Sequence, residues 1–214
     1  VRGRPSLRSA VGTALVLALV AGVLWDGSHV RFRREGKTFG LDYRAKDAAW
    51  EAEAAFARTL DDALPDGTAV FQFPIVAFPE AHPPGRMVDY DHLRAWVHLP
   101  PGRLRWSYGA MRGRPDGDWQ LKVRDEIGEA GSLPLLIGLG FRAVWVDTWG
   151  YDDDGARVRA ELDEATGVDP IVSDDGRTLV YDLRPLAEAL AADGRDAASL
   201  AAEAERTLGV GPRR

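Results

Sequence analysis

The run GFRAVWVD, residues 140–147, predicts a buried β-strand, because β-branched and aromatic residues follow one another directly after a glycine. The apolar stretch before it, Ser132 to Leu139, predicts a helix that Ser132 caps and Gly140 ends. A helix that leads straight into a strand is a building step of a sheet covered by helices. The strand also carries Asp147 to its carboxyl end, where catalytic residues lie in barrel and doubly wound folds.

A second helix and strand are predicted upstream of this run. Apolar residues recur at every fourth position, the spacing of an amphipathic helix, within the stretch from Asp47 to Leu64: Ala52, Phe56, Leu60 and Leu64. Residues 65–67, Pro-Asp-Gly, end that helix, and the run AVFQFPIV, residues 69–76, is typical of a buried strand. The chain therefore repeats the step from helix to strand.

Downstream, the pattern predicts a further helix, a hairpin and a helical tail. The acidic residues 152–154 offer N-caps for a helix that ends at Gly167. Two short β-branched runs, 171–172 and 178–182, flank the turn sequence SDDGR and predict a hairpin. Residues after Leu186 are rich in Ala and Glu, which favours a helix. The expected fold class is α/β or α+β, with a mixed sheet layered by helices.

The region from Phe78 to Arg114 is different, because prolines and glycines interrupt every regular pattern in it. We expect a long loop region with one short strand at Ala95 to His98, followed by a helix whose face carries Trp119, Val123 and Ile127. A loop region of this length inside a compact domain is commonly a functional surface.

One transmembrane helix is expected ahead of this domain. No charged residue occurs from Ser9 to Trp25, and the run is apolar on all sides of a helix. A cleaved secretory signal is one alternative, since Arg2, Arg4 and Arg8 precede the run, although no small-residue cleavage motif closes it. A buried core helix is the other. Basic residues flank the run on both sides, so they do not choose a direction of crossing.

Composition sets the domain organisation and the class of partner. We divide the 214 residues into a basic flank (1–8), a transmembrane helix (9–25), a connector (26–46), a soluble domain (47–185) and an Ala/Glu-rich helical tail (186–214). The bilayer is the expected partner of residues 9–25. Acidic residues outnumber basic ones by 33 to 27, and the net charge of −6 repels a phosphate backbone, so no nucleic-acid partner is expected. With no cysteine, the chain has no disulfide and no thiolate metal site.

The region from 78 to 114 gathers the groups that can carry chemistry. Carboxylates, histidines and arginines beside aromatic rings are what a protein uses to bind a sugar or a phosphosugar. The candidate binding residues are Asp89, Arg105, Trp106, Tyr108, Arg112 and Arg114. The alternative is a loop packed on the sheet, with Arg105 and Arg112 paired to Glu80 or Asp89 as internal struts.

No motif identifies a reaction, since the sequence lacks G-x-S-x-G, a phosphate-binding loop, a dinucleotide fingerprint and H-E-x-x-H. Glu80 and Asp147 are the candidate carboxylates if the domain is a hydrolase. Asp89 and Asp91 have the spacing of a metal-binding D-x-D pair, and residues 152–154 resemble part of a calcium loop, but both lack the further oxygen ligands that hard metals need. We therefore expect no metal site and no cofactor.

Several segments together resemble the C-terminal extracytoplasmic domain of large bacterial polytopic envelope proteins, described as sugar-transferase-like or phosphoglycerol-transferase-like. The most specific part is the block LRWSYGAMRGR, residues 104–114. The resemblance covers about Leu24 to Pro185 and includes VFQFP at 70–74, FPE at 78–80, DYD at 89–91 and SDDGR at 173–177. Such proteins carry many membrane helices and this sequence shows one, so the resemblance implies the tail of a longer protein or a truncated relative.

The resemblance implies a function at the cell membrane. The domain would be extracytoplasmic, an accessory or acceptor-binding part of an envelope glycan or phosphoglycerol transferase system, with envelope carbohydrate or a lipid-linked sugar as partner. In transferases that use lipid-linked sugars the catalytic acid typically lies on an early external loop, so the catalytic residues are expected outside this chain. Two alternatives stay open: a non-catalytic membrane-anchored structural or interaction module, and a carboxylate-dependent domain like a glycoside hydrolase.

Overall fold

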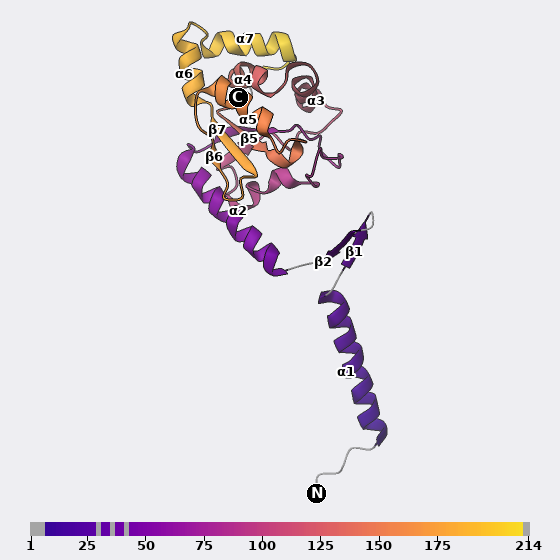
Figure 1. The fold of residues 1–214 in the computed structure, drawn as a ribbon. Coiled ribbons are helices and arrows are strands. Elements are labelled where there is room, and N and C mark those ends of the chain that lie inside the picture. The colour runs from indigo at the N-terminus through magenta and orange to yellow at the C-terminus, as the bar shows by residue number, and fades with distance from the viewer. Residues whose placement is uncertain (1–6, 29–30, 35–36, 41–42, 212–214) are drawn as a thin grey trace. The chain divides into compact units, whose positions relative to one another are not determined.

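The computed structural model describes residues 7–28, 31–34, 37–40 and 43–211, and the side chains of residues 11–25 and 46–211 except Asp116. The chain divides into two compact units, Val1–Glu51 and Ala52–Arg214 (Figure 1). The boundary falls within helix α2 (Tyr43–Ala63), which begins in the first unit and ends in the second.

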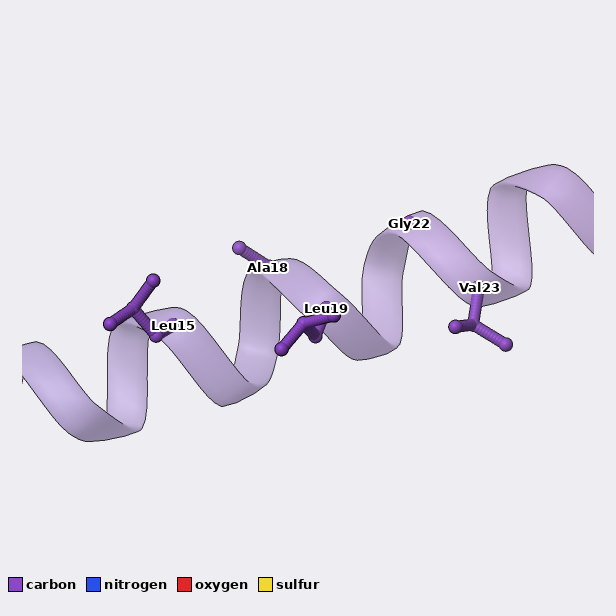
Figure 2. Close-up of a pocket in the computed structure, with 5 residues that line it drawn as sticks. All are labelled: Leu15, Ala18, Leu19, Gly22 and Val23. Atoms are coloured by element: carbon purple, nitrogen blue, oxygen red, sulfur yellow. The ribbon is translucent and has the colours of Figure 1, made fainter.

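The first unit contains helix α1 (Leu7–Ser28) and a two-stranded antiparallel sheet, β1 (Arg31–Arg34) and β2 (Lys37–Gly40). The helix expected at 9–25 is thus present, and the expected connector contains a hairpin. The large apolar side chains of α1 are half or more exposed, and a shallow groove runs along it where Ala18 and Gly22 are small (Figure 2). Within the part of the chain whose side chains are described, no helix combines the length and apolarity that a membrane crossing requires.

The second unit is an α/β domain built on a mixed five-stranded sheet, as the sequence predicted. The strands are β3 (Thr68–Phe73), β4 (Leu104–Trp106), β5 (Ala143–Asp147), β6 (Ile171–Val172) and β7 (Thr178–Asp182). Their order is β4-β3-β5-β7-β6, with β3 parallel to both β4 and β5, and with β7 antiparallel to both β5 and β6. The predicted hairpin is the pair β6 and β7.

Helices cover both faces of this sheet, because successive strand residues point to opposite sides. On one face, Leu60 and Leu64 at the end of α2 pack with Val70, Trp145 and Val180. The other face packs against α3 (Pro115–Lys122), α4 (Glu129–Gly138), α5 (Ala156–Thr166), α6 (Arg184–Ala192) and α7 (Ala197–Leu208). The predicted apolar face is confirmed at Phe56, Leu60 and Leu64, whereas Ala52 is exposed and Ala57 is buried in its place.

The region from 78 to 114 differs from the prediction in two places. Residues 96–98 form a short 3-10 helix, η2 (Trp96–His98), after η1 (Asp91–Leu93), so the predicted strand at Ala95 to His98 is wrong. The apolar residues Ala95 and Leu99 lie four positions apart and both pack on the core beneath α2, which is a helical spacing. The sequence also missed β4, a three-residue edge strand without enough length to show alternation.

The helices on the second face settle several predicted boundaries. Helix α4 begins at Glu129, so Ser132 is not its cap; the Ser132 hydroxyl donates to the backbone oxygen of Glu129. The N-cap residue of α5 is Gly155 and not one of the acidic residues 152–154, but the Asp153 carboxylate accepts hydrogen bonds from the backbone nitrogens of Gly155 and Arg157. The predicted helix around Trp119 ends as a single π-helical stretch, η3 (Val123–Ile127).

The C-terminal tail packs on the domain core. Gly194 separates α6 from α7, with a positive φ of 84°. Helix α7 lies against α4 (Figure 1), and a Cβ placed on Gly138 of α4 would be 2.3 Å from the backbone oxygen of Leu200. The two helices therefore approach backbone to backbone at a position that only glycine allows.

Candidate functional site

Between β3 and β5 the order in which the chain adds strands to the sheet reverses. Open α/β sheets bind ligands at such a switch point, outside the carboxyl ends of the strands. The chain leaves β3 to form β4 on one side and returns as β5 on the other, with both parallel to β3. Residues 74–92 cross the carboxyl ends of β3 and β5 in close contact. A Cβ on Gly85 would lie 2.3 Å from the backbone oxygen of Trp149, and one on Gly150 would lie 2.3 Å from the Pro74 ring.

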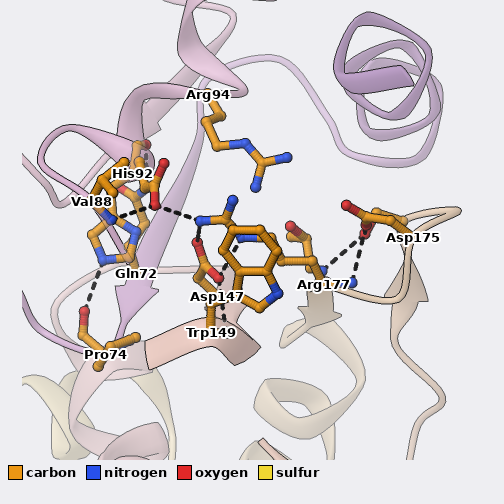
Figure 3. Close-up of polar contacts among 12 residues, drawn as sticks. Gln72, Pro74, Val88, His92, Arg94, Asp147, Trp149, Asp175 and Arg177 are labelled. Carbon is orange, nitrogen blue, oxygen red and sulfur yellow. Dashed lines mark hydrogen bonds and ion pairs between the residues drawn. The ribbon is translucent and has the colours of Figure 1, made fainter. Parts of the chain in front are cut away.

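A buried ion-pair network holds this edge together. Arg177, at the start of β7, donates from Nε to Asp147 Oδ1 (2.8 Å) and from Nη2 to Asp147 Oδ2 (2.6 Å). The same Nη2 donates to Asp91 Oδ2 at 2.6 Å, and that oxygen also accepts the backbone N–H of Val88 at 2.8 Å (Figure 3). Three segments far apart in sequence are thereby tied to one guanidinium.

The charge of Arg177 is secured by its partners. Burial alone would lower the pKa of Arg177, but the hydrogen bonds and negative charge of Asp147, with the charge of Asp91, outweigh it and raise that pKa. A bidentate guanidinium–carboxylate pair is among the strongest side-chain interactions, whereas an isolated buried charge is very costly. The network therefore has a structural role, and loss of either partner would leave the other charge buried without compensation.

Trp149 lies on top of this network at the end of β5. Its backbone N–H donates to Asp147 Oδ1 at 3.1 Å, and the guanidinium of Arg177 lies 3.9 Å from the centre of its ring (Figure 3). The residue is 36% exposed, and the mostly exposed Arg86 places its guanidinium 5.0 Å from the same ring. The indole thus lies near two guanidinium groups, one buried and one exposed.

A second buried network ties β3 to the loops beyond it. Gln72 donates from Nε2 to the backbone oxygen of His92 at 2.7 Å, and its Oε1 accepts the backbone N–H of Tyr108 at 3.1 Å. The His92 Nε2 lies 2.8 Å from the backbone oxygen of Pro74. Since a carbonyl oxygen can only accept, Nε2 is the donor in this bond. Burial lowers the pKa of His92, which favours the neutral imidazole.

Three aromatic side chains meet above this network. The Phe78 ring lies edge-on to the Tyr108 ring at 5.5 Å between centroids, and to the Tyr90 ring at 6.4 Å. Tyr90 is 43% exposed. Burial, the neighbouring Tyr90 and the charge of Asp89 raise the pKa of Tyr108, so its hydroxyl stays protonated. We call Phe78, Tyr90 and Tyr108 the aromatic cluster.

The predicted binding residues fall into two groups. Tyr108 is a member of the aromatic cluster, and the charge of Asp89 acts on it. Arg112 lies next to the cluster, because its backbone N–H donates to the backbone oxygen of Phe78 at 3.0 Å. The side chain of Arg112 is exposed and borders a narrow crevice of about 10 Å³, room for about one water. Arg114 follows two residues later, exposed, as the N-cap of α3.

The other two predicted residues lie on the edge strand β4. Arg105 is exposed and donates from Nε to the backbone oxygen of Gly67 at 2.9 Å. Trp106 is half-buried with its ring edge-on to Trp145 at 5.8 Å, within the core beneath α2. The structure therefore does not place these two side chains with the aromatic cluster, and it gives Trp106 an internal contact.

The candidate carboxylates are placed differently from one another. Asp147 is fully buried, and both of its oxygens accept from Arg177, which removes it from reach of a substrate. Glu80 is exposed on the loop after Phe78. The sequence suggested that Arg105 and Arg112 form internal ion pairs. Internal ion pairs are instead formed by Arg177, as described, and by Arg94, whose Nε lies 2.7 Å from Glu53 Oε1.

Sequence reasoning missed Arg86, Trp149 and Arg177 as members of one site, although it singled out Asp147 and the turn that contains Arg177. The position of Trp149 two residues after a strand-terminal carboxylate was the available signal. Among the described residues, no group of three or more His, Asp or Glu side chains is placed to hold a metal ion. No family model, curated protein or solved structure matches this chain.

Proposed function

We propose that this chain is a membrane-anchored extracytoplasmic domain that binds envelope carbohydrate, as the accessory or acceptor-binding part of a glycan or phosphoglycerol transferase system. The observation that carries the proposal is the aromatic cluster with Asp89 beside it and the exposed Arg112 bonded to its Phe78 backbone. Aromatic faces receive the C–H groups of a sugar ring, while carboxylate and guanidinium groups bind its hydroxyl or phosphate substituents.

The burial of Asp147 favours binding over catalysis by the predicted pair of Asp147 and Glu80. Glycoside hydrolysis needs two carboxyl groups that flank the scissile bond. Asp147 is committed to Arg177 inside the protein, so it does not supply one of them. An acceptor-binding role requires only an exposed surface of suitable chemistry, which the loops after β3 and β4 present.

We propose that α1 anchors the chain in a membrane. Its sequence carries no charge from Ser9 to Trp25, and its described apolar side chains are exposed all the way round the helix. Contiguous apolar surface of this kind is rarely left in water by a soluble protein. A bilayer would cover it, and the basic residues on both sides of the run would lie among lipid headgroups.

Titration of the full chain in detergent with soluble envelope-glycan fragments tests the proposal. The 5 tyrosines can be labelled as fluorotyrosine, so that ¹⁹F spectra report Tyr90 and Tyr108 individually once Tyr→Phe variants assign them. We expect both resonances to shift on titration. Tyr90→Ala should weaken binding about 2- to 10-fold, since an aromatic contact contributes about 0.5–1.5 kcal/mol.

Trp96→Ala is the matched control, because Trp96 is also an exposed aromatic but lies on η2, outside the aromatic cluster. Its removal should leave the affinity unchanged. Fragments that bind without shifting Tyr90 or Tyr108, or an equal loss of affinity in both alanine variants, would remove the aromatic cluster as the binding surface.

A further inference from the structure

We infer that Trp149 and Arg86 form a subsite for a sugar that carries an acid group, with the indole as the stacking platform and the guanidinium as the arm that pairs with the acid. The inference rests on the proposed carbohydrate function and names a part of the ligand, a phosphorylated or carboxylated sugar residue. It concerns residues outside the aromatic cluster, so the two can succeed or fail separately.

The platform is rigid because Arg177 and Asp147, which support it, are buried. The guanidinium of Arg177 lies 3.9 Å from the ring centre and is itself fixed by two bonds to Asp147 and one to Asp91. The backbone N–H of Trp149 is held by Asp147. A ring fixed in this way loses little conformational freedom when a ligand stacks on it, which favours affinity.

The second guanidinium near the platform, that of Arg86, belongs to an exposed side chain that can move. The side chain of Arg86 is 59% exposed and its ion-pair partner Asp154 is 70% exposed, so their pairing contributes little stability and is screened by salt. The backbone of Arg86 is fixed, since its N–H donates to the Trp149 oxygen at 2.7 Å. The guanidinium can therefore leave the ring or Asp154 while its Cα stays beside the platform.

The chemistry of the two groups selects the ligand. The face of an indole is electron-rich and attracts C–H groups, which a sugar ring presents on one side. A guanidinium offers parallel N–H donors that match a phosphate or carboxylate. A neutral sugar satisfies only the ring, and a free phosphate satisfies only the arginine. A sugar phosphate satisfies both, and it also replaces the partner that Arg86 loses when it releases Asp154.

The test uses the full chain in detergent with its 7 tryptophans labelled as 5-fluorotryptophan, and Trp149→Phe assigns the resonance of Trp149. The probes are glucose 6-phosphate, glucose and inorganic phosphate. We expect the Trp149 resonance to shift with glucose 6-phosphate at millimolar concentration. The same shift should need a glucose concentration at least about 5-fold higher, because an exposed charge pair contributes about 1 kcal/mol. Phosphate alone can pair only with Arg86, 5.0 Å from the ring, and should shift the resonance less than glucose 6-phosphate does.

Two charge variants then assign the acid-binding arm. Arg86→Gln should reduce the affinity for glucose 6-phosphate to that for glucose, while Asp154→Asn should increase it about 2-fold, because the arginine no longer has a competing partner. Trp96→Phe, at an exposed indole on η2, should change neither affinity. A rise in affinity on Asp154→Asn cannot come from a destabilised fold, so this variant keeps the test decisive if Arg86→Gln folds poorly.

The inference is wrong if no probe shifts the Trp149 resonance, or if inorganic phosphate shifts it as much as glucose 6-phosphate does. It is also wrong if the unmodified chain binds glucose and glucose 6-phosphate with equal affinity. If Tyr90 and Tyr108 respond to glycan fragments while Trp149 does not, the subsite is wrong and the proposed function stands. If neither responds, both are wrong.

Discussion

Asp147 and Arg177 are 30 positions apart in sequence, and their side chains form a bidentate pair with contacts of 2.8 and 2.6 Å inside the protein. The pair joins the end of β5 to the start of β7, and through Asp91 it also fixes the loop that crosses the sheet edge. The candidate site is therefore built on a buried charge network, and the supported residue, Trp149, is exposed on top of it.

Removal of the cation should destabilise the domain strongly. Arg177→Leu leaves Asp147 and Asp91 without their cation, and loss of one partner of a buried pair costs about 3–5 kcal/mol. Denaturant unfolding of the full chain in detergent, followed by tryptophan fluorescence, measures the loss. Arg157→Gln is the control: Arg157 pairs with Glu161 on the surface of α5, where such a pair contributes about 0.3–0.5 kcal/mol. Equal losses in the two variants would show that the network has no special role.

The contact between α4 and α7 depends on the missing side chain of Gly138. Gly138→Ala places a methyl group against the backbone of Leu200, which α7 can relieve only by moving away, so we expect a loss of about 1–3 kcal/mol. Gly131 lies in the same helix and is exposed, and a Cβ added there would have its nearest neighbouring atom at 3.5 Å, an ordinary contact. Gly131→Ala should instead stabilise the helix by about 0.5–1 kcal/mol. Thermal unfolding of both variants checks the opposite signs.

The free energy of unfolding should decrease on acidification because of His92. Burial lowers the pKa of its imidazole from the ordinary 6.5, although the bond to Pro74 and the charge of Asp147 oppose the shift. Above pH 6.5 the side chain is neutral in both states and contributes no pH dependence. As the pH falls through 6.5, the unfolded chain takes up the proton first, so the free energy of unfolding decreases until the lower folded-state pKa is reached.

The comparison of the unmodified chain with His92→Gln isolates this contribution. Urea unfolding at about pH 7.5, 6.5 and 5.5, on both sides of the ordinary pKa, gives the free energy of unfolding for each protein. The glutamine variant is expected to be less stable at the highest pH, because it does not reproduce the packing of the ring, and to lose less stability on acidification. Parallel pH profiles for the two proteins would mean that His92 does not cause the decrease.

The proposed membrane anchoring by α1 predicts that a charge in the middle of this helix weakens membrane association. Leu17 is an exposed apolar residue near the centre of the uncharged run. Arginine at the centre of a membrane helix costs about 2.5–3.5 kcal/mol, so Leu17→Arg should shift the full chain from the membrane to the soluble fraction after extraction at high pH. Leu17→Ala, which keeps the helix apolar, should stay with the membrane. If Leu17→Arg is retained as well as Leu17→Ala, α1 is not the anchor.

The sequence alone determined the elements whose pattern is local. The apolar spacing of α2, the β-branched runs of β3 and β5, and the turn between β6 and β7 all place their signal within a few residues, and each element is present. Their order predicted an α/β or α+β fold, and the assembled sheet is that of an α/β domain. The acidic residues 152–154 were expected at the start of a helix for the same reason, and Asp153 accepts hydrogen bonds from backbone groups two and four positions away.

Only the tertiary structure decided which distant residues meet. Asp91 lies 86 positions from Arg177, and Arg86 lies 68 positions from Asp154, so no periodic pattern relates them. The place of Trp106 was decided by strand order, since β4 beside β3 turns its ring onto Trp145 and into the core. Local chemistry specifies helices, strands and turns, whereas the neighbours of a side chain depend on how the whole sheet is assembled.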